Sequence, residues 1–315
     1  MKDLRILFMG TPEFAVHILD EMIKADYSVV GVVTAPDKPA GRGRRIHESA
    51  VKKFATKKNL AVYQPTNLKS ESFQKDLKEI NPDIAVVVAF RMLPKVVWDF
   101  PKYGTFNLHA SLLPDYRGAA PINWAIINGE KETGVTTFFL DEQIDTGKII
   151  LQEKIEIKPD DTAGSLHDKL MEKGADLVIQ TLNLISKQEH QATEQTLPHP
   201  KKFAPKLNNE NTRIDWSKTP EEIYNLVRGL NPYPVAWAYL QNADQKLRCK
   251  IFNVQSESAD HNFKVGSIIK TKNQLKIAVP GGYIYILEMQ LPGKRKMPIQ
   301  DLLNGLQLET DAKMC

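Results

Sequence analysis

The stretch from Thr105 to Pro121 reads TFNLHASLLPDYRGAAP and places polar side chains within and directly after an apolar strand. A strand over residues 105–110 puts Asn107 and His109 on one face, because side chains alternate along a strand. Asparagine supplies a neutral N–H donor and histidine a base or a charged donor, a pairing suited to the oxygen of a tetrahedral intermediate. Taken singly, Asn107 could equally pair at a strand end, and His109 could be a satisfied core histidine.

The residues that follow this strand are suited to line a binding site for a small molecule. Two apolar side chains and a rigid proline together could line a flat ligand. The candidate ligand contacts are Ser111, Leu112, Leu113 and Pro114. Further on, Pro121 suits the first position of a helix that we expect over residues 122–128.

Apolar strands and amphipathic helices alternate along the first half of the chain. Leu4 to Met9 and Ser28 to Thr34 are apolar runs on either side of a segment with helical spacing, and the pattern repeats as far as Phe90. Such alternation predicts an α/β domain on a mostly parallel sheet, with the polar stretch outside the strand ends. Gly10 has no glycine two or five positions later, so the sequence argues against a dinucleotide turn and an NAD cofactor.

The composition is that of a globular protein: 315 residues, 42% hydrophobic and 25% charged, are enough for two domains. No run of about 18 uncharged apolar residues exists, so no membrane span is expected. The N-terminus lacks the apolar core of a secretory signal. Cys249 and Cys315 form neither a disulfide framework nor a zinc site, which favours a reducing cytoplasm. The seven histidines include no ligand-spaced pair, so no metal is expected, and no obligate protein partner is evident.

The second half of the chain has a different pattern. Residues 188–205 are polar and contain three prolines, which is typical of a linker. Beyond them, turn residues separate strand-like segments near residues 237–240, 247–254, 266–271, 275–279 and 283–291. This spacing predicts a small antiparallel barrel or sheet. The expected domains are therefore residues 1–188 and 207–315, joined by a linker over 189–206.

Basic residues are gathered in two places. Residues 201–315 carry 17 Lys and Arg against 11 Asp and Glu, a net charge of +6, whereas residues 1–200 carry 25 against 27. Residues 35–46, APDKPAGRGRRI, contain two prolines and two glycines and are expected to form a mobile loop. The cations of this loop suggest a polyanionic partner. They are Lys38, Arg42, Arg44 and Arg45.

Several motifs resemble those of the folate-dependent formyltransferase family, and within it the enzymes that act on methionyl-tRNA. They are Gly10-Thr11-Pro12-Glu13-Phe14, Pro39-Ala40-Gly41-Arg42-Gly43, the Asn-x-His and SLLP run quoted above, Asp145-Thr146-Gly147 and Asn231-Pro232-Tyr233-Pro234. The resemblance covers nearly the full length of the chain. It departs from the family pattern at residues 90–93, FRML, which lack the usual glycine in a segment that borders the folate pocket in the family.

The resemblance implies a Rossmann-like catalytic domain followed by a small OB-like domain that binds tRNA. The implied reaction is transfer of a formyl group from 10-formyltetrahydrofolate, a co-substrate, to the free amino group of initiator methionyl-tRNA, for translation initiation in the cytoplasm. Asp145 joins Asn107 and His109 as the implied catalytic set, and residues 111–114 are the implied folate contacts. On this hypothesis Asn107 and protonated His109 hold the oxyanion, while Asp145 keeps His109 charged and relays a proton. The basic loop then embraces the acceptor end of the tRNA.

Three other functions are compatible with parts of this pattern. Formyltransferases acting on an amino sugar nucleotide also carry the Asn-x-His and SLLP motifs and a second domain, but a small substrate would not require the Gly-Arg-Gly-Arg-Arg loop. Relatives acting on glycinamide ribonucleotide usually stop after the catalytic domain. The third alternative is a non-catalytic RNA-binding or folate-sensing protein, and the intact Asn107, His109 and Asp145 argue against it.

Overall fold

The computed structural model describes residues 4–40, 45–196 and 202–315. Contacts divide the chain into two compact units, which interleave in sequence. The first unit comprises residues 1–118, 133–155 and 168–203, and the second comprises residues 119–132, 156–167 and 204–315. Helix α5 (Pro121–Ile127) falls in the second unit because it packs against α7 (Pro220–Gly229). The domain boundaries expected from the sequence stay a prediction.

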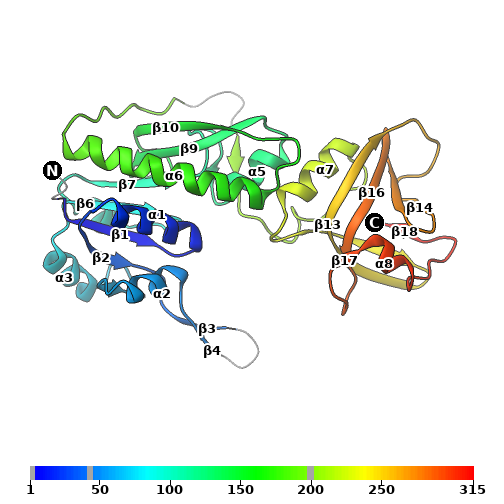
Figure 1. Ribbon diagram of the computed structural model, residues 1–315, viewed down its shortest axis with the longest axis horizontal. Coiled ribbons are helices and arrows are strands. Elements are labelled where there is room, and N and C mark those ends of the chain that lie inside the picture. The colour runs from blue at the N-terminus through cyan, green and yellow to red at the C-terminus, as the bar shows by residue number, and fades with distance from the viewer. Residues whose placement is uncertain (1–3, 41–44, 197–201) are drawn as a thin grey trace. The chain divides into compact units, whose positions relative to one another are not determined.

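The first unit is built on a seven-stranded sheet with the order β10-β9-β7-β6-β1-β2-β5 (Figure 1). The central strands β1 and β6 are buried on both faces, as expected for apolar runs in a parallel sheet. Pairing is parallel from β5 through to β7, and β7 pairs antiparallel with β9. The predicted mostly parallel sheet is confirmed. The strands are β1 (Ile6–Gly10), β2 (Val29–Val33), β5 (Val62–Tyr63), β6 (Ile84–Val88), β7 (Thr105–His109), β9 (Glu132–Phe139) and β10 (Ile149–Glu156).

Helices pack on both faces of this sheet and leave one face of β7 for the site. On one face, α3 buries Phe73, Leu77 and Ile80 in a cluster that includes Val87 of β6. On the other, α6 approaches β7 so closely that a Cβ on Gly174 would lie 2.8 Å from the Leu108 side chain. Because Leu108 faces α6, its neighbours Asn107 and His109 face away from that helix. The helices are α1 (Glu13–Lys24), α2 (Ala50–Lys57), α3 (Glu71–Ile80), α4 (Lys95–Trp98) and α6 (Ala163–Ser186).

Residues 35–46 are more regular than their composition predicts. The strands β3 (Lys38–Ala40) and β4 (Arg45–His47) pair antiparallel, with Pro39 opposite Ile46. The expected mobility of this segment stays a prediction, and residues 41–44, which include Arg42 and Arg44, lie outside the described residues. The arms form a two-stranded ribbon because extended residues on both sides of the glycines can exchange backbone hydrogen bonds. Two further short strands, β8 (Arg117–Gly118) and β11 (Phe203–Ala204), form a separate pair.

The second unit is an antiparallel sheet with the order β14-β15-β16-β13-β12-β18. Its two ends meet, because Ser267 bridges Lys313 and the Met314 N–H donates to the Gly266 carbonyl at 2.9 Å, so the sheet is nearly closed. The predicted small barrel is confirmed. Its strands are β12 (Ala236–Asn242), β13 (Gln245–Ser258), β14 (Ile268–Lys270), β15 (Leu275–Val279), β16 (Gly282–Gln290), β17 (Met297–Pro298) and β18 (Lys313–Met314), and its last helix is α8 (Ile299–Leu303).

Candidate active site

The predicted catalytic face of β7 lies at the carboxyl end of that strand. His109 is the last residue of β7 and pairs with Thr136 of β9, while Asn107 pairs with Phe138. The imidazole stands edge-on to the Phe138 ring, with ring centroids 6.5 Å apart and an angle of 88° between the planes. His109 is only 6% exposed. The strand and its neighbour therefore hold the imidazole in a buried, defined position.

Hydrogen bonding fixes which imidazole nitrogen carries a proton. Nε2 of His109 lies 2.9 Å from the carbonyl oxygen of Tyr116, which can only accept. Nε2 is therefore the protonated nitrogen, and Nδ1 is the one that can gain or lose a proton. Tyr116 itself has a left-handed φ of +60°, an uncommon conformation for an aromatic residue, which turns its carbonyl toward the ring. The strained residue serves the orientation of the imidazole.

Asp145 lies beside the free nitrogen of this ring. Its Oδ2 is 3.9 Å from Nδ1 of His109 and accepts a hydrogen bond from the backbone N–H of Gly118 at 3.0 Å. Asp145 has a left-handed φ of +55°, which aspartate tolerates better than most residues. The carboxylate is 16% exposed. The predicted convergence of a strand histidine and a distant turn aspartate is thus present in the geometry.

The turn that carries Asp145 is closed by a glycine. A Cβ on Gly147 would lie 1.7 Å from the carbonyl oxygen of Phe139, so only glycine lets the turn fold this tightly onto the end of β9. On the exposed side, the Asp141 carboxylate accepts hydrogen bonds from the Gln143 N–H at 2.9 Å and the Thr146 hydroxyl at 2.6 Å. The close approach at Gly147 and the hydrogen bonds to Asp141 both restrict the conformation of the turn, and so they restrict the position of Asp145.

Asn107 has a free amide. Its side chain is half-buried, and it makes no hydrogen bond to any residue in the described part of the chain. Its two N–H donors lie on the same strand face as His109 and are not among the buried, unpartnered atoms of the described residues, so a ligand oxygen could reach them.

The four predicted folate contacts divide into two pairs. Leu112 and Pro114 are partly exposed, whereas Ser111 is fully buried and Leu113 is 3% exposed. The Ser111 hydroxyl donates to the Asp115 carbonyl at 2.6 Å, so it is already used within the protein. The Leu113–Pro114 peptide bond is cis. The exposed pair can touch a ligand directly, and the buried pair supports the segment from below.

The segment that departs from the family pattern lines a groove of about 660 Å³. Met92 is 67% exposed in its wall, and Val96 is 47% exposed. The ammonium of Lys95 lies 3.2 Å from the Glu142 carboxylate. This ion pair connects the wall of the groove to the turn that carries Asp145. Ile144 in the same turn is 61% exposed. Exposed apolar side chains such as Met92 and Val96 in the wall of a groove are typical of a ligand surface.

Sequence reasoning gave no role to Arg117 and Gln195, which lie against the turn of Asp145. The Arg117 guanidinium donates to the side-chain oxygen of Gln195 at 2.6 Å. Burial holds the pKa of Arg117 below its usual value, against the opposing effect of the Asp145 and Asp141 carboxylates. For Arg117 the available signal was a cation within the polar stretch. Gln195 lies in the predicted linker, where nothing in the sequence distinguishes it from the other polar residues around it.

Two of the four predicted tRNA contacts, Lys38 and Arg45, belong to the strands of the β3–β4 ribbon. Lys38 is exposed in β3. Arg45 belongs to β4, but its side chain is outside the description, and Arg42 and Arg44 fall in the gap at residues 41–44. Lys52, which follows in α2, is paired with Asp37 and with Glu48.

The second unit carries a face on which cations and aromatic rings interleave. The guanidinium of Arg248 stands 4.0 Å from the centroid of Trp237, and the ammonium of Lys246 stands 4.5 Å from that of Tyr239. Arg213 lies within 6 Å of both rings. Strand alternation sends Lys250 to the same side as Arg248 and Lys246, and none of these outward positions on β12 and β13 is acidic. We call these six residues the aromatic-cation face.

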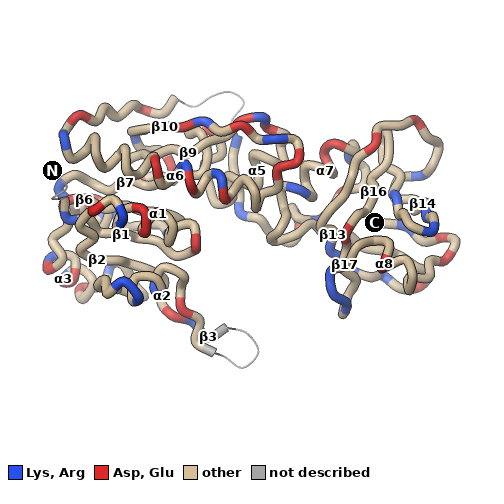
Figure 2. The backbone as a smooth tube through the Cα atoms, in the orientation of Figure 1, with Lys and Arg blue, Asp and Glu red and all other residues tan. Residues whose placement is uncertain are grey.

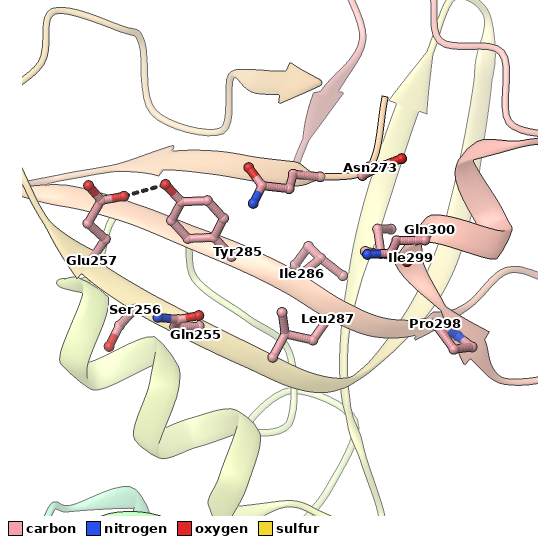
Figure 3. Close-up of a pocket in the computed structure, with 11 residues that line it drawn as sticks. Gln255, Ser256, Glu257, Asn273, Tyr285, Ile286, Leu287, Pro298, Ile299 and Gln300 are labelled. Atoms are coloured by element: carbon pink, nitrogen blue, oxygen red, sulfur yellow. Dashed lines mark hydrogen bonds between the residues drawn. The ribbon is translucent and has the colours of Figure 1, made fainter. Parts of the chain in front are cut away.

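A separate groove of about 620 Å³ lies on the second unit over β13, β16 and the approach to α8 (Figure 3). Its lining includes the side-chain amides of Gln255, Asn273 and Gln300, and the Tyr285 hydroxyl donates to Glu257 at 2.5 Å. The lining contains a carboxylate and no lysine or arginine. Its charge is therefore poorly suited to phosphate groups. Basic residues lie elsewhere on the unit, for example in the turn before β17, Lys294 to Lys296 (Figure 2).

Within residues 4–40, 45–196 and 202–315, no group of three or more His, Cys, Asp or Glu side chains could hold a metal ion. The helices of the same residues include none that is long and apolar enough to cross a membrane. Both cysteines are free thiols, and Cys249 is buried in the core of the second unit.

Comparison with protein families gives two matches that together span most of the chain. A family described as formyl transferase matches residues 4–182, and one described as formyl transferase, C-terminal domain, matches residues 206–307. All the catalytic candidates fall in the first match and the aromatic-cation face falls in the second. Gln195 lies between the two matches.

Individual relatives are similar over their full length. The chain is 55% identical over 314 residues to a methionyl-tRNA formyltransferase of Flavobacterium johnsoniae, with 100% of both chains covered. It is 47% identical over 322 residues to a methionyl-tRNA formyltransferase of Bacteroides thetaiotaomicron, with 99% of both chains covered.

Solved structures share the fold at lower identity. An N-formyltransferase of Helicobacter canadensis in complex with folinic acid and dTDP-3-aminofucose is 22% identical, has a TM-score of 0.65, and covers 93% of this chain and 100% of its own. HypX of Aquifex aeolicus in complex with tetrahydrofolic acid is 18% identical, has a TM-score of 0.64, and covers 98% of this chain and 50% of its own.

Proposed function

Since the chain belongs to the formyl transferase family, we propose that it transfers a formyl group from 10-formyltetrahydrofolate to the amino group of initiator methionyl-tRNA. The bond formed joins the methionine nitrogen to the formyl carbon, and the bond broken joins that carbon to N10 of the folate. The products are N-formylmethionyl-tRNA and tetrahydrofolate. The observation that carries this function is the placement of His109 and Asp145, with the titratable nitrogen of the ring turned toward the carboxylate.

The reaction needs a neutral amine, a held oxyanion and a mobile proton. An α-amino group has a pKa of about 8, so much of it is protonated near neutral pH and must lose a proton before attack. The Asp145 carboxylate lies 3.9 Å from Nδ1 of His109, so a group held beside the ring can reach it directly or through one water. We assign to Asp145 the transfer of the proton from the attacking nitrogen to the leaving one, while His109 keeps its own Nδ1 proton.

Asn107 is our candidate for holding the oxyanion together with protonated His109. Its amide has no partner among the described residues, and it shares the strand face of the imidazole. Nε2 of His109 is held by the Tyr116 carbonyl, so the ring's donor to the oxyanion is the proton on Nδ1. A fixed amide and a charged ring stabilise negative charge as it develops, with no reorganisation at the moment of reaction.

For the folate we propose a site formed by the segment 111–114 and the groove near Met92. Leu112 and Pro114 present partly exposed apolar surface, and Met92, Val96 and Ile144 add more beside the turn of Asp145. Ser111 and Leu113 would act as buried supports of this wall. Folate-containing complexes of structures with the same fold support the choice of co-substrate.

For the tRNA we propose two contacts, one on each unit. The segment 38–45, with Lys38, Arg42, Arg44 and Arg45, would contact the acceptor end, because arginines form paired hydrogen bonds to phosphates and stack on unpaired bases. The aromatic-cation face would hold another part of the tRNA, since interleaved rings and cations are the chemistry of single-strand and backbone recognition. The reaction would take place in the cytoplasm, where charged tRNA is available.

The test is incubation of the full chain with labelled 10-formyltetrahydrofolate and charged initiator tRNA. We expect label to appear on methionine attached to initiator tRNA, with much less on elongator methionyl-tRNA. An amino sugar nucleotide serves as the control for a small acceptor. Label on the sugar and none on either tRNA would refute the proposed acceptor and leave a formyltransferase of another specificity.

A further inference from the structure

The side chain of Gln195 joins two loops of the candidate active site. Its Nε2 donates to the carbonyl oxygens of Asp145 at 3.1 Å and Gly147 at 2.7 Å. Its Oε1 accepts from Nε of Arg117 at 3.2 Å and from Nη2 at 2.6 Å. Both N–H donors and both lone pairs of the amide are therefore used, which no other residue type of this length can reproduce.

The segment that carries Gln195 is itself fixed to the sheet. Thr193 exchanges two backbone hydrogen bonds of 2.8 Å with Ile149 at the start of β10, and Lys148 forms an ion pair of 2.9 Å with Glu194. Residues 193–195, which we call the strap, thus lie along the outgoing arm of the turn that bears Asp145. The predicted linker 189–206 accordingly contains a segment anchored on the first unit.

The two loops that Gln195 joins meet again at the catalytic carboxylate. Arg117 precedes Gly118, whose N–H donates to Oδ2 of Asp145, the oxygen that faces His109. On the other side, Gln195 holds the backbone carbonyl of Asp145 itself. Asp145 is thus held at its backbone carbonyl by Gln195 and at its carboxylate by the Gly118 N–H. The Gln195 side chain connects these two contacts, because it also binds Arg117, the neighbour of Gly118.

We propose that Gln195 is a positioning residue that sets the distance between the Asp145 carboxylate and the His109 ring. This inference rests on the catalytic role proposed for Asp145. Gln195 touches neither the imidazole nor the carboxylate, and it acts through the backbone of the turn and through Arg117. A displacement of about 1 Å at a reacting group can reduce a rate by about 100-fold, so a single amide in this place can control turnover.

The test compares two substitutions with a matched control in the full chain. Gln195→Glu keeps the acceptor for Arg117 but turns a carboxylate toward two carbonyl oxygens, and Gln195→Met keeps the length without any hydrogen bond. Gln191→Glu makes the same chemical change four residues earlier, at an exposed position with no hydrogen bond among the described residues. Formylation of methionyl-tRNA gives kcat and both KM values, and thermal unfolding gives Tm.

We expect both Gln195 variants to lose about 10- to 100-fold in kcat, with Tm and both KM values close to those of Gln191→Glu. A kcat equal to the control, or a loss that only follows a fall in Tm, would overturn the positioning role. Asp145→Asn is measured beside them. If it is inactive while the Gln195 variants are fully active, only this inference fails, whereas an active Asp145→Asn removes both the inference and the proposed role of the carboxylate.

Discussion

Nδ1 of His109 lies 3.9 Å from Oδ2 of Asp145, while Nε2 of the same ring donates to the Tyr116 carbonyl. The carbonyl only accepts, so Nε2 carries a proton and Nδ1 is the ring nitrogen that faces the carboxylate. The separation exceeds a direct hydrogen bond, which leaves room for a closing movement or a bridging water. The pair is therefore arranged for proton transfer at one defined atom.

Replacement of Asp145 by Asn should remove the charge and keep the shape. The amide oxygen can still accept the Gly118 N–H, so the loop should stay in place. We expect kcat to fall by about 10²- to 10⁴-fold, the usual range for loss of a proton-transfer group, with little change in either KM. Steady-state formylation kinetics measure this, and a variant with wild-type kcat would contradict the assignment.

Asn107→Ala removes the free amide next to His109 on the strand face. Loss of one oxyanion donor typically reduces kcat by about 10²- to 10³-fold. Folate affinity should change far less, because the interaction forms mainly in the transition state. Single-turnover rates together with equilibrium folate titration separate the two effects. Equal losses in both would show that Asn107 binds the ground state.

Gly147→Ala should disturb the turn that carries Asp145. The added Cβ would lie 1.7 Å from the Phe139 carbonyl oxygen, so the turn must open. We expect a loss of about 1–3 kcal/mol in the free energy of unfolding, as for other overpacked sites, together with reduced kcat. Gly305→Ala is the control, since nothing lies within 4 Å of its Cβ position. Urea unfolding measures the stabilities, and equal values for the two variants would count against the tight turn.

Local patterns predicted the elements well, because burial periodicity is a property of neighbouring residues. The strand expected at 275–279 coincides with β15. The expected alternation of strands and helices before Phe90 includes α3, which begins after Ser70, whose hydroxyl accepts the Phe73 N–H. The alternation within the polar stretch likewise predicted that Asn107 and His109 share one face of the strand. In the structure this face points away from α6, which packs against Leu108.

What the sequence could not show depends on contacts distant along the chain. Gln195 meets the carbonyl of Asp145 across 50 residues, and nothing in a proline-rich polar segment indicates which amide will do so. Residues 35–46 were expected to form a mobile loop because they contain two prolines and two glycines. The pairing of β3 with β4 depends on contacts between the two arms, which composition does not show. The full burial of Ser111 could not be predicted from strand alternation, because this residue lies beyond the end of β7.

The aromatic-cation face should make tRNA binding sensitive to salt. Arg248→Ala removes the cation over Trp237, and we expect a higher KM for methionyl-tRNA with unchanged folate KM. The slope of log KM against log salt concentration should decrease by about 0.7–0.9, the value for one phosphate contact. Lys272→Ala, at an exposed lysine outside the face, is the control for net charge. If both variants change the slope equally, the effect comes from overall charge and the face has no special role.

Cys249 should resist thiol reagents until the medium is strongly alkaline. It is fully buried in β13, and burial raises the pKa of its thiol to about 11. Because the thiolate is the reactive form and a reagent must also reach the buried sulfur, modification in the native state should stay slow below that pH. The unfolded chain ionises this thiol first, so its contribution to stability falls between about pH 9 and 11. Cys315→Ser leaves Cys249 as the single thiol, and we expect no reaction at pH 8 until urea unfolds the chain. Rapid modification of the folded variant at pH 8 would show that the core of the second unit opens.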